Sequence, residues 1–182
     1  MEQNSDSEAI VRSKQVLEVF AVGSEFCRFI DRIDKTDRAT ALLFLQSILP
    51  ALYLKGTFLP AVEVGDDSAN ERFVTEEEYE TVRLQLANFF GDSDFFSAVD
   101  LADDAVDSSP ISLSELLTDI YTDLKDFLML YAKESLSAKE NAVASCQYYF
   151  HNGWGARLLL ALPQIHHLVA NNYNEPSTNQ EI

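Results

Sequence analysis

Apolar residues recur every three or four positions along most of the chain, which is the spacing of amphipathic helices. The pattern predicts five helices, over about residues 6–34, 37–60, 75–91, 112–131 and 137–169. The second is apolar on nearly all sides, so we expect it to be buried on most faces. Pro50 is expected to kink or split this helix, and Pro60 to end it. No stretch alternates apolar and polar residues as a strand would.

Turn and capping residues mark where the predicted helices begin and end. Asp37 is a predicted N-cap, and Gly91 is a predicted helix stop. Three segments have the spacing of a capping box, namely Thr75–Glu78, Ser112–Glu115 and Ser137–Glu140. The stretch 92–109 is acidic and has no helical period. We therefore predict an all-α antiparallel bundle of about five helices, forming one domain over residues 1–170, with a polar, disordered tail over 171–182.

The composition narrows the class of protein. The chain has 182 residues, 47% of them hydrophobic, with 13 basic and 30 acidic side chains and a net charge of −17. That is enough apolar material for one core, and so acidic a chain is not expected to bind nucleic acid directly. The start of the chain lacks the pattern of a signal peptide, which favours the cytoplasm. Cys27 and Cys146 are interpreted as reduced, buried thiols, although their spacing leaves a disulfide open.

One segment is long and apolar enough to be considered as a membrane-spanning helix. Residues 39–62 approach the length of a membrane span, but they include Lys55, Pro50 and Pro60. A lysine at mid-depth in a bilayer costs about 2.5–3.5 kcal/mol, and no second apolar segment offers it a partner. We therefore expect a core helix and no membrane association.

The negative charge is concentrated in the middle of the chain. Residues 65–128 carry 17 acids and 3 bases, whereas the flanking segments are close to neutral. The predicted third helix, the stretch 92–109 and the fourth helix therefore share an acidic face. Such a face either keeps the protein soluble or binds a basic protein or a cation.

Two groups of carboxylates on this face are candidates for chemistry. Asp119, Asp123 and Asp126 follow helical spacing and should lie on one face of the fourth helix. Glu76, Glu77 and Glu80 resemble the EExxE half of the all-α nucleotide pyrophosphohydrolases, which bind Mg²⁺ or Mn²⁺. Their second half is ExxD, and the nearest match here is Asp123-x-x-Asp126, after a longer gap and with Asp in place of Glu. Helix capping explains the glutamates equally well.

Three further residues are candidates for a binding pocket. His151, Trp154 and Arg157 surround Gly153 and Gly155 in the predicted fifth helix. Glycine destabilises a helix interior by about 1 kcal/mol relative to alanine, so these two need a structural reason. One reason is a close helix approach with Trp154 as a core anchor, and the other is a small pocket.

Lys55 is a separate candidate on the apolar second helix. Its side chain either reaches the surface or pairs with a carboxylate, and its natural partner would be an aspartate of the fourth helix.

The chain as a whole resembles a bacterial family catalogued as domain of unknown function 5063. The resemblance covers about residues 15–170 and is carried, in order, by Glu25–Phe29, Leu49–Lys55, Arg72–Glu77, Asp119–Leu128 and Trp154–Gly155. It implies a small cytosolic helical protein. The family has no assigned chemistry, so the resemblance supplies no catalytic residue and no cofactor.

The sequence leaves three possible functions. The first is a non-enzymatic interaction module whose acidic face binds a basic protein, with no cofactor. The alternative is a divalent-metal-dependent nucleotide hydrolase that uses Glu76, Glu77, Glu80, Asp123 and Asp126 with Mg²⁺ or Mn²⁺. A weaker third possibility is an acidic mimic of nucleic acid.

Overall fold

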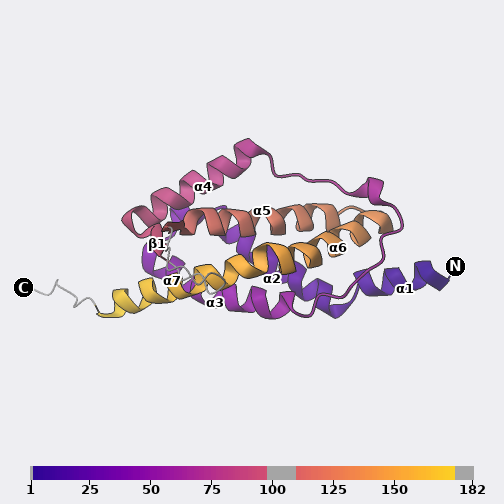
Figure 1. The fold of residues 1–182 in the computed structure, drawn as a ribbon, viewed down its shortest axis with the longest axis horizontal. Helices are drawn as coiled ribbons and strands as arrows, with labels where there is room; N and C mark the ends of the chain where they lie inside the picture. The colour runs from indigo at the N-terminus through magenta and orange to yellow at the C-terminus, as the bar shows by residue number, and fades with distance from the viewer. Residues whose placement is uncertain (1, 98–109, 175–182) are drawn as a thin grey trace, which may run out of the picture.

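The computed structural model describes residues 2–97 and 110–174 and confirms the all-α class. The helices within these ranges are α1 (Glu2–Val11), α2 (Lys14–Ile30), α3 (Arg38–Gly56), α4 (Glu76–Phe90), α5 (Leu113–Tyr131), α6 (Leu136–Asn152) and α7 (Trp154–Asn174). Short 3₁₀ turns lie at Ile33–Lys35, Asp67–Ala69 and Gly91–Ser93. Figure 1 shows an elongated bundle in which most helices run along the long axis.

Most helix starts follow the predicted capping chemistry. The side chains of Asp37, Thr75 and Ser112 accept hydrogen bonds from backbone amides three residues on, at 3.0–3.2 Å. Gly91 ends α4 with a φ of 55°, in the left-handed region that favours glycine. The third predicted box is wrong, because Ser135 caps α6 through the amide of Ala138 at 3.2 Å.

Two predicted helices are each divided into two. The first breaks between Val11 and Lys14, giving α1 and α2, and the fifth breaks at Gly153, giving α6 and α7. A Cβ at Gly155 would lie 2.2 Å from the carbonyl oxygen of Phe150, so the α6–α7 elbow requires glycine there. Because α7 continues to Asn174, residues 171–174 of the predicted tail are helical, and the rest lie outside the described residues.

A small hairpin occupies part of the predicted irregular stretch. Strands β1 (Phe95–Ser97) and β2 (Pro110–Ser112) pair antiparallel, with Phe95 opposite Ser112. Asp94 holds the hairpin against α5, since its carboxylate accepts a 2.7 Å bond from the amide of Ser114 and bonds from two serine hydroxyls. Strands of three residues are too short to show an alternating apolar–polar pattern, so the sequence did not predict them. Residues 98–109 lie outside the described part of the chain.

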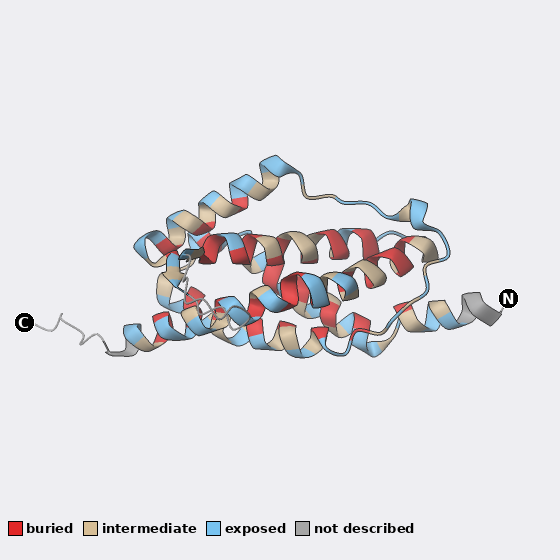
Figure 2. Ribbon diagram, in the orientation of Figure 1, coloured by how far each residue is buried: buried red, intermediate tan, exposed pale blue. Residues whose placement is uncertain are grey.

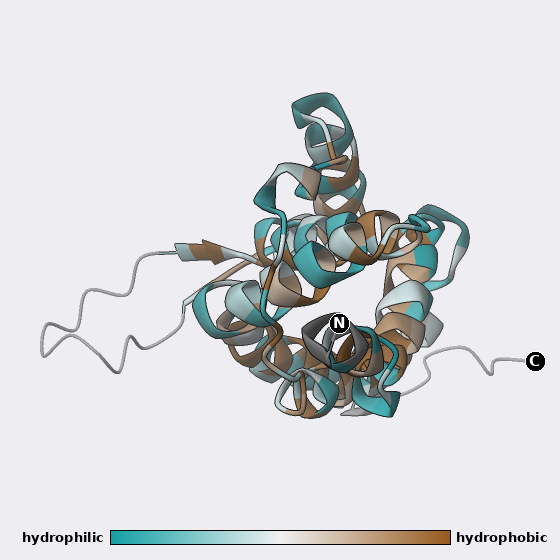
Figure 3. Ribbon diagram, turned by 90° about the vertical axis from the view of Figure 1, so that its right-hand side faces the viewer, coloured by the Kyte–Doolittle hydropathy of each residue, from teal (hydrophilic) through white to brown (hydrophobic). Residues whose placement is uncertain are grey.

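Helix α5 is the centre of the bundle, because α2, α4, α6 and α7 all pack against it. Its buried face and those of its neighbours form one core, in which Trp154, Tyr121 and Phe26 are the largest fully buried side chains (Figure 2). Viewed along the long axis, α4 lies at the upper edge of the bundle (Figure 3).

Helix α3 is less buried than its apolar sequence predicts. It is long and apolar enough to cross a membrane on length and composition, yet only 33% of its apolar window is buried inside the bundle. The prediction of burial on most faces is therefore wrong, because α3 packs on α2 and α7 along one side only. Pro50 lies within α3 without dividing it, and the helix ends at Gly56, before Pro60.

The cysteines agree with the prediction of reduced, buried thiols. Cys27 and Cys146 are free, and each is 2% exposed. Burial raises the pKa of both thiols, which keeps them protonated at neutral pH.

The elbow gives a test of the fold. Gly155→Ala should lower the free energy of unfolding by about 1–3 kcal/mol, because its new methyl group collides with backbone that has no room to move. Gly23→Ala is the matched control, since its Cβ would meet Leu124 at an ordinary 3.7 Å. It should stabilise α2 by about 0.4–1 kcal/mol. Urea unfolding of both variants measures the difference, and equal effects would contradict a tight elbow.

Candidate functional site

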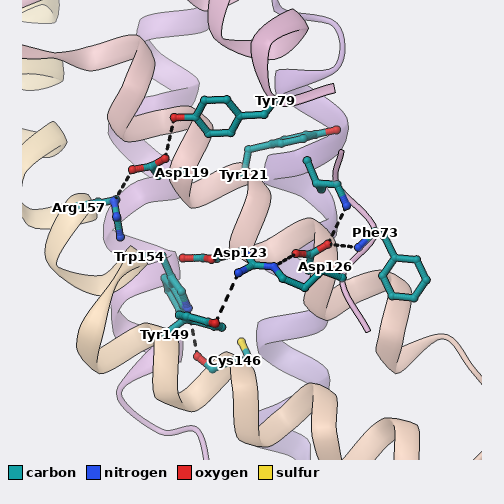
Figure 4. Close-up of polar contacts among 12 residues, drawn as sticks. Phe73, Tyr79, Asp119, Tyr121, Asp123, Asp126, Cys146, Tyr149, Trp154 and Arg157 are labelled. Carbon is teal, nitrogen blue, oxygen red and sulfur yellow. Dashed lines mark hydrogen bonds and ion pairs between the residues drawn. The ribbon is translucent and has the colours of Figure 1, made fainter. Parts of the chain in front are cut away.

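The aspartates of α5 lie on one face, as their spacing predicts, and that face is covered. Residues 57–75 connect α3 to α4 and cross over α5 and α6; we call this connection the strap. The strap lies on one side of Asp123 and Asp126, and the α6–α7 elbow lies on the other (Figure 4). The aspartates therefore face other elements of the protein, not open solvent.

Asp126 fastens the end of the strap. One carboxylate oxygen accepts from the backbone amides of Phe73 and Val74 at 2.7 and 2.9 Å, and the other accepts from Arg72 Nε at 2.7 Å. The aspartate side chain is 11% exposed, so these bonds form largely out of water. Charge-assisted bonds of this kind are stronger than neutral ones, which fixes where α4 begins.

Asp119 joins α4, α5 and α7. Its two oxygens accept from Arg157 Nε at 2.7 Å and from the hydroxyl of Tyr79 at 2.9 Å. Burial, together with this bond to a carboxylate, raises the pKa of Tyr79 to about 12. Tyr79 is therefore a fixed donor at neutral pH.

Asp123 lies between these two anchors and is the least well compensated. Its contact with Arg72 Nη2 is 3.3 Å long, and its side chain is only 12% exposed. Burial raises its pKa to about 6, against the opposing effect of Arg72 and Arg157. A Cβ at Gly153 would lie 3.2 Å from Asp123 Oδ2, so this glycine leaves room for the carboxylate.

A small cavity of about 60 Å³ opens beside this group. Its lining includes the polar residues Arg72, Asp123, Ser145 and Tyr149, together with Cys146. Arg72 also extends over the ring of Tyr149, with the guanidinium carbon 5.3 Å from the ring centre. The cavity has room for a few waters, and its polar groups are largely engaged with one another.

The three residues predicted to line a pocket, His151, Trp154 and Arg157, lie in different surroundings. Trp154 is fully buried and donates its indole N–H to the carbonyl of Cys146 at 3.1 Å, as expected of a core anchor. His151 is exposed at the end of α6, and Arg157 turns to Asp119. The glycines at 153 and 155 are explained by close packing at the elbow.

Lys55 is paired, but with a different residue from the one predicted. Its ammonium lies 3.0 Å from Glu18 on α2, and both side chains are about one third exposed. The aspartates of α5 were the wrong partners, because α3 contacts α2 and α7 and α5 lies behind them.

The carboxylates of the hydrolase alternative lie apart. Asp123 and Asp126 are engaged by Arg72, and Glu80 pairs with Arg83 at 2.9 Å. Glu76 and Glu77 are exposed on the first turn of α4. Over residues 2–97 and 110–174, no three acidic, histidine or cysteine side chains are grouped so as to hold a metal ion.

Sequence reasoning missed Arg72, Tyr79 and Tyr149. A signal for Arg72 was available, because it is the single base among the eight acids of residues 63–80. A lone base in such surroundings is a natural partner for buried acids. Nothing in the local sequence indicates which acids, since Asp126 is 54 positions away.

Comparisons with known proteins agree with the resemblance noted from the sequence. Residues 11–171 match the model of the family described as Domain of unknown function (DUF5063). The crystal structure of protein BF1032 from Bacteroides fragilis is 31% identical, with a TM-score of 0.78 over 95% of this chain and 99% of that chain. A comparison with curated proteins finds no match.

Asp126→Asn tests the anchor of the strap. The variant keeps the shape but removes the charge that three donors share, so it should lower the free energy of unfolding by about 1.5–3 kcal/mol. The amides of Phe73 and Val74 should also lose protection from hydrogen exchange. Glu80→Gln is the control, because its exposed pair with Arg83 lies within one helix turn. Unchanged protection at both amides would contradict the anchor.

The raised pKa of Asp123 predicts a pH dependence. Its reference pKa is 3.8 and its folded value is about 6, so between these values the folded state binds more protons than the unfolded state. Stability from this group therefore increases as pH falls from about 7 to 4 and is absent above the folded pKa.

Asp123→Asn removes this contribution. The stability difference between wild type and variant should shift in favour of wild type by about 1–3 kcal/mol over that range. Chemical unfolding at several pH values measures it, and other titrating groups cancel in the difference. Parallel pH profiles would show that Asp123 titrates normally.

Proposed function

Because the chain belongs to the DUF5063 family, whose description assigns no function, we propose one on geometric grounds: the protein is a non-enzymatic interaction module that binds a basic partner protein. The binding surface is an acidic ridge, defined as the acids of residues 63–80. These are Glu63, Asp66, Asp67, Glu71, Glu76, Glu77, Glu78 and Glu80, and all except Glu78 are exposed. The strap and α4 carry the ridge along the upper edge in Figure 1.

The observation that carries this proposal is the direction of Arg72. It is the single base within the ridge segment, and its guanidinium is turned toward Asp123 and Asp126 on α5. Its charge therefore compensates buried acids and does little to neutralise the ridge. Glu76 and Glu77 face solvent beside it.

The ridge is narrower than the acidic face expected from the sequence. Asp119, Asp123 and Asp126 already have partners inside the protein, so they are excluded from the binding surface. Residues 98–109 are outside the described part of the chain and are not included. The ridge that remains is one edge of the bundle with a strongly negative potential, which steers a basic partner into contact.

The contacts of the same carboxylates favour binding over hydrolysis. The hydrolase alternative needs Asp123 and Asp126 to coordinate a cation, and Arg72 takes that position. A cation would have to displace a guanidinium from two partly buried carboxylates. The interaction module needs no such rearrangement.

Glu76→Gln combined with Glu77→Gln tests the ridge, with deca-lysine as the probe. At about 50 mM salt the double variant should bind the probe about fivefold more weakly, because both charges lie at the centre of the ridge. Glu8→Gln with Glu25→Gln is the matched control, since it removes two exposed carboxylates from α1 and α2. The control should change the Kd by less than about twofold.

Calorimetry measures both affinities, and three outcomes separate the alternatives. Equal losses in the two double variants would mean that only the total charge matters, which contradicts a ridge. Binding should weaken as salt is raised. Mg²⁺ at matched ionic strength should change neither the affinity nor the thermal midpoint, and a Mg²⁺-specific rise in the midpoint would favour the hydrolase.

A further inference from the structure

The outer side of α3 and α7 carries several exposed leucines. The two helices pack against each other, and Gln46 on α3 lies 3.0 Å from the ring of His166 on α7. Leu43 and Leu54 on α3 are 42% and 54% exposed, and Leu159 on α7 is 51% exposed. We call this surface the α3–α7 face.

Two grooves follow the seam between these helices. One, of about 190 Å³, is lined by Leu43 of α3 and Val169 of α7. The other, of about 210 Å³, is lined by Pro50 and Leu54 of α3 and by Leu159 of α7. Thr57 also lines the second groove, and its hydroxyl donates to the carbonyl of Leu54 at 2.7 Å. The face therefore has both exposed leucines and apolar hollows.

The α3–α7 face is also free of acids. None of the 30 aspartates and glutamates of the chain lies on α3 or α7. The lysine and arginine residues of the two helices are Arg38, Lys55 and Arg157, and each is engaged with another element; the two histidines of α7 are neutral at pH 7. Lys55 pairs with Glu18, Arg157 with Asp119, and Arg38 donates to the carbonyl of Phe89. In a protein of net charge −17, this face therefore has no acids, and its lysine and arginine side chains contact other elements.

We propose that the α3–α7 face is the contact surface of a homodimer, in which two copies of this chain pack their apolar faces together. The charge distribution favours a second copy of the chain as the partner of this face. Two copies of a chain with charge −17 repel each other wherever their carboxylates meet, and on this face they bring none together. A two-fold interface also requires one surface to supply both protrusions and hollows, which the exposed leucines and the grooves of this face do.

Other occupants fit this charge distribution less well. A basic protein is drawn to the acidic ridge, which is on the opposite edge of the bundle (Figure 1). An anionic lipid surface repels a chain of charge −17. Exposed apolar surface of this kind on a soluble protein marks an interaction site.

Sedimentation velocity of the full chain at micromolar concentrations tests the dimer. The wild type should sediment with twice the 20.4 kDa mass of one chain. Leu54→Glu and Leu159→Glu should each raise the dimer Kd by about tenfold or more, because the two-fold axis places each new charge in the interface twice. Both side chains are half exposed, so the fold should survive, and circular dichroism checks this.

Leu84→Glu is the matched control, since Leu84 is 51% exposed on α4, away from the face. It should remain dimeric. Raising the salt should preserve or tighten the dimer by screening repulsion, whereas binding at the ridge weakens, so the two proposals succeed or fail separately.

Three results would overturn the dimer. The first is a monomeric wild type up to about 200 µM at high salt, a concentration that would detect even weak association. The second is a dimer that survives Leu54→Glu and Leu159→Glu, which would place the interface elsewhere. The third is a monomer that floats with phosphatidylcholine vesicles and loses this property in the two glutamate variants, which would assign the face to lipid.

Discussion

The pairing of three carboxylates on one helix is the constraint on which the rest of the fold depends. The side chains of Asp123 and Asp126 are 12% and 11% exposed, and that of Asp119 is 31% exposed. A charge removed from water without a partner costs several kcal/mol, so these residues need donors from around α5. Arg72 and two amides come from the strap, Arg157 comes from α7, and the Tyr79 hydroxyl comes from α4. Satisfying one face of α5 therefore positions three other segments.

The same pairing shapes the outer surface. Nine of the 13 basic side chains form ion pairs within the described residues, and two of these, Arg72 and Arg157, serve the aspartates of α5. Residues 63–80 carry eight acids and one base, and that base, Arg72, pairs with the aspartates of α5. Glu71 and Glu80 pair with Lys133 and Arg83, but the segment as a whole stays strongly negative. The apolar faces of α3 and α7 have no acids. One edge of the bundle thus becomes negative and the opposite edge neutral.

The sequence predicted those helix ends that depend on interactions between residues close together in the chain. Asp37, Thr75, Ser112 and Gly91 each act within one helical turn, and their roles were readable from the sequence. The breaks at Ser13 and Gly153 were missed because the apolar period continues across them. The break at Gly153 accompanies tertiary packing, since Phe150 and Trp154 on either side of it pack closely on Gly56 of α3.

The candidate site also has one part that the sequence predicts and one part that it does not. The spacing of the three aspartates placed them on one face, but helical spacing carries no information about what covers that face. The strap that covers it is irregular chain with one short 3₁₀ turn, so it has no helical or strand period in the sequence. The burial of α3 was overestimated for a related reason, because an apolar surface looks the same in sequence whether a neighbouring helix or another molecule covers it.

The placement of α3 and α7 also affects how the protein is made. Gln46 and His166 meet in the folded state but are 120 residues apart, so α3 leaves the ribosome long before its main partner exists. Of the 30 acids, 20 are synthesised between the end of α3 and the start of α7. Nascent chains with an uncovered α3 thus carry a growing negative charge that keeps neighbouring chains apart. The negative charge in the middle of the sequence therefore opposes aggregation of nascent chains during translation.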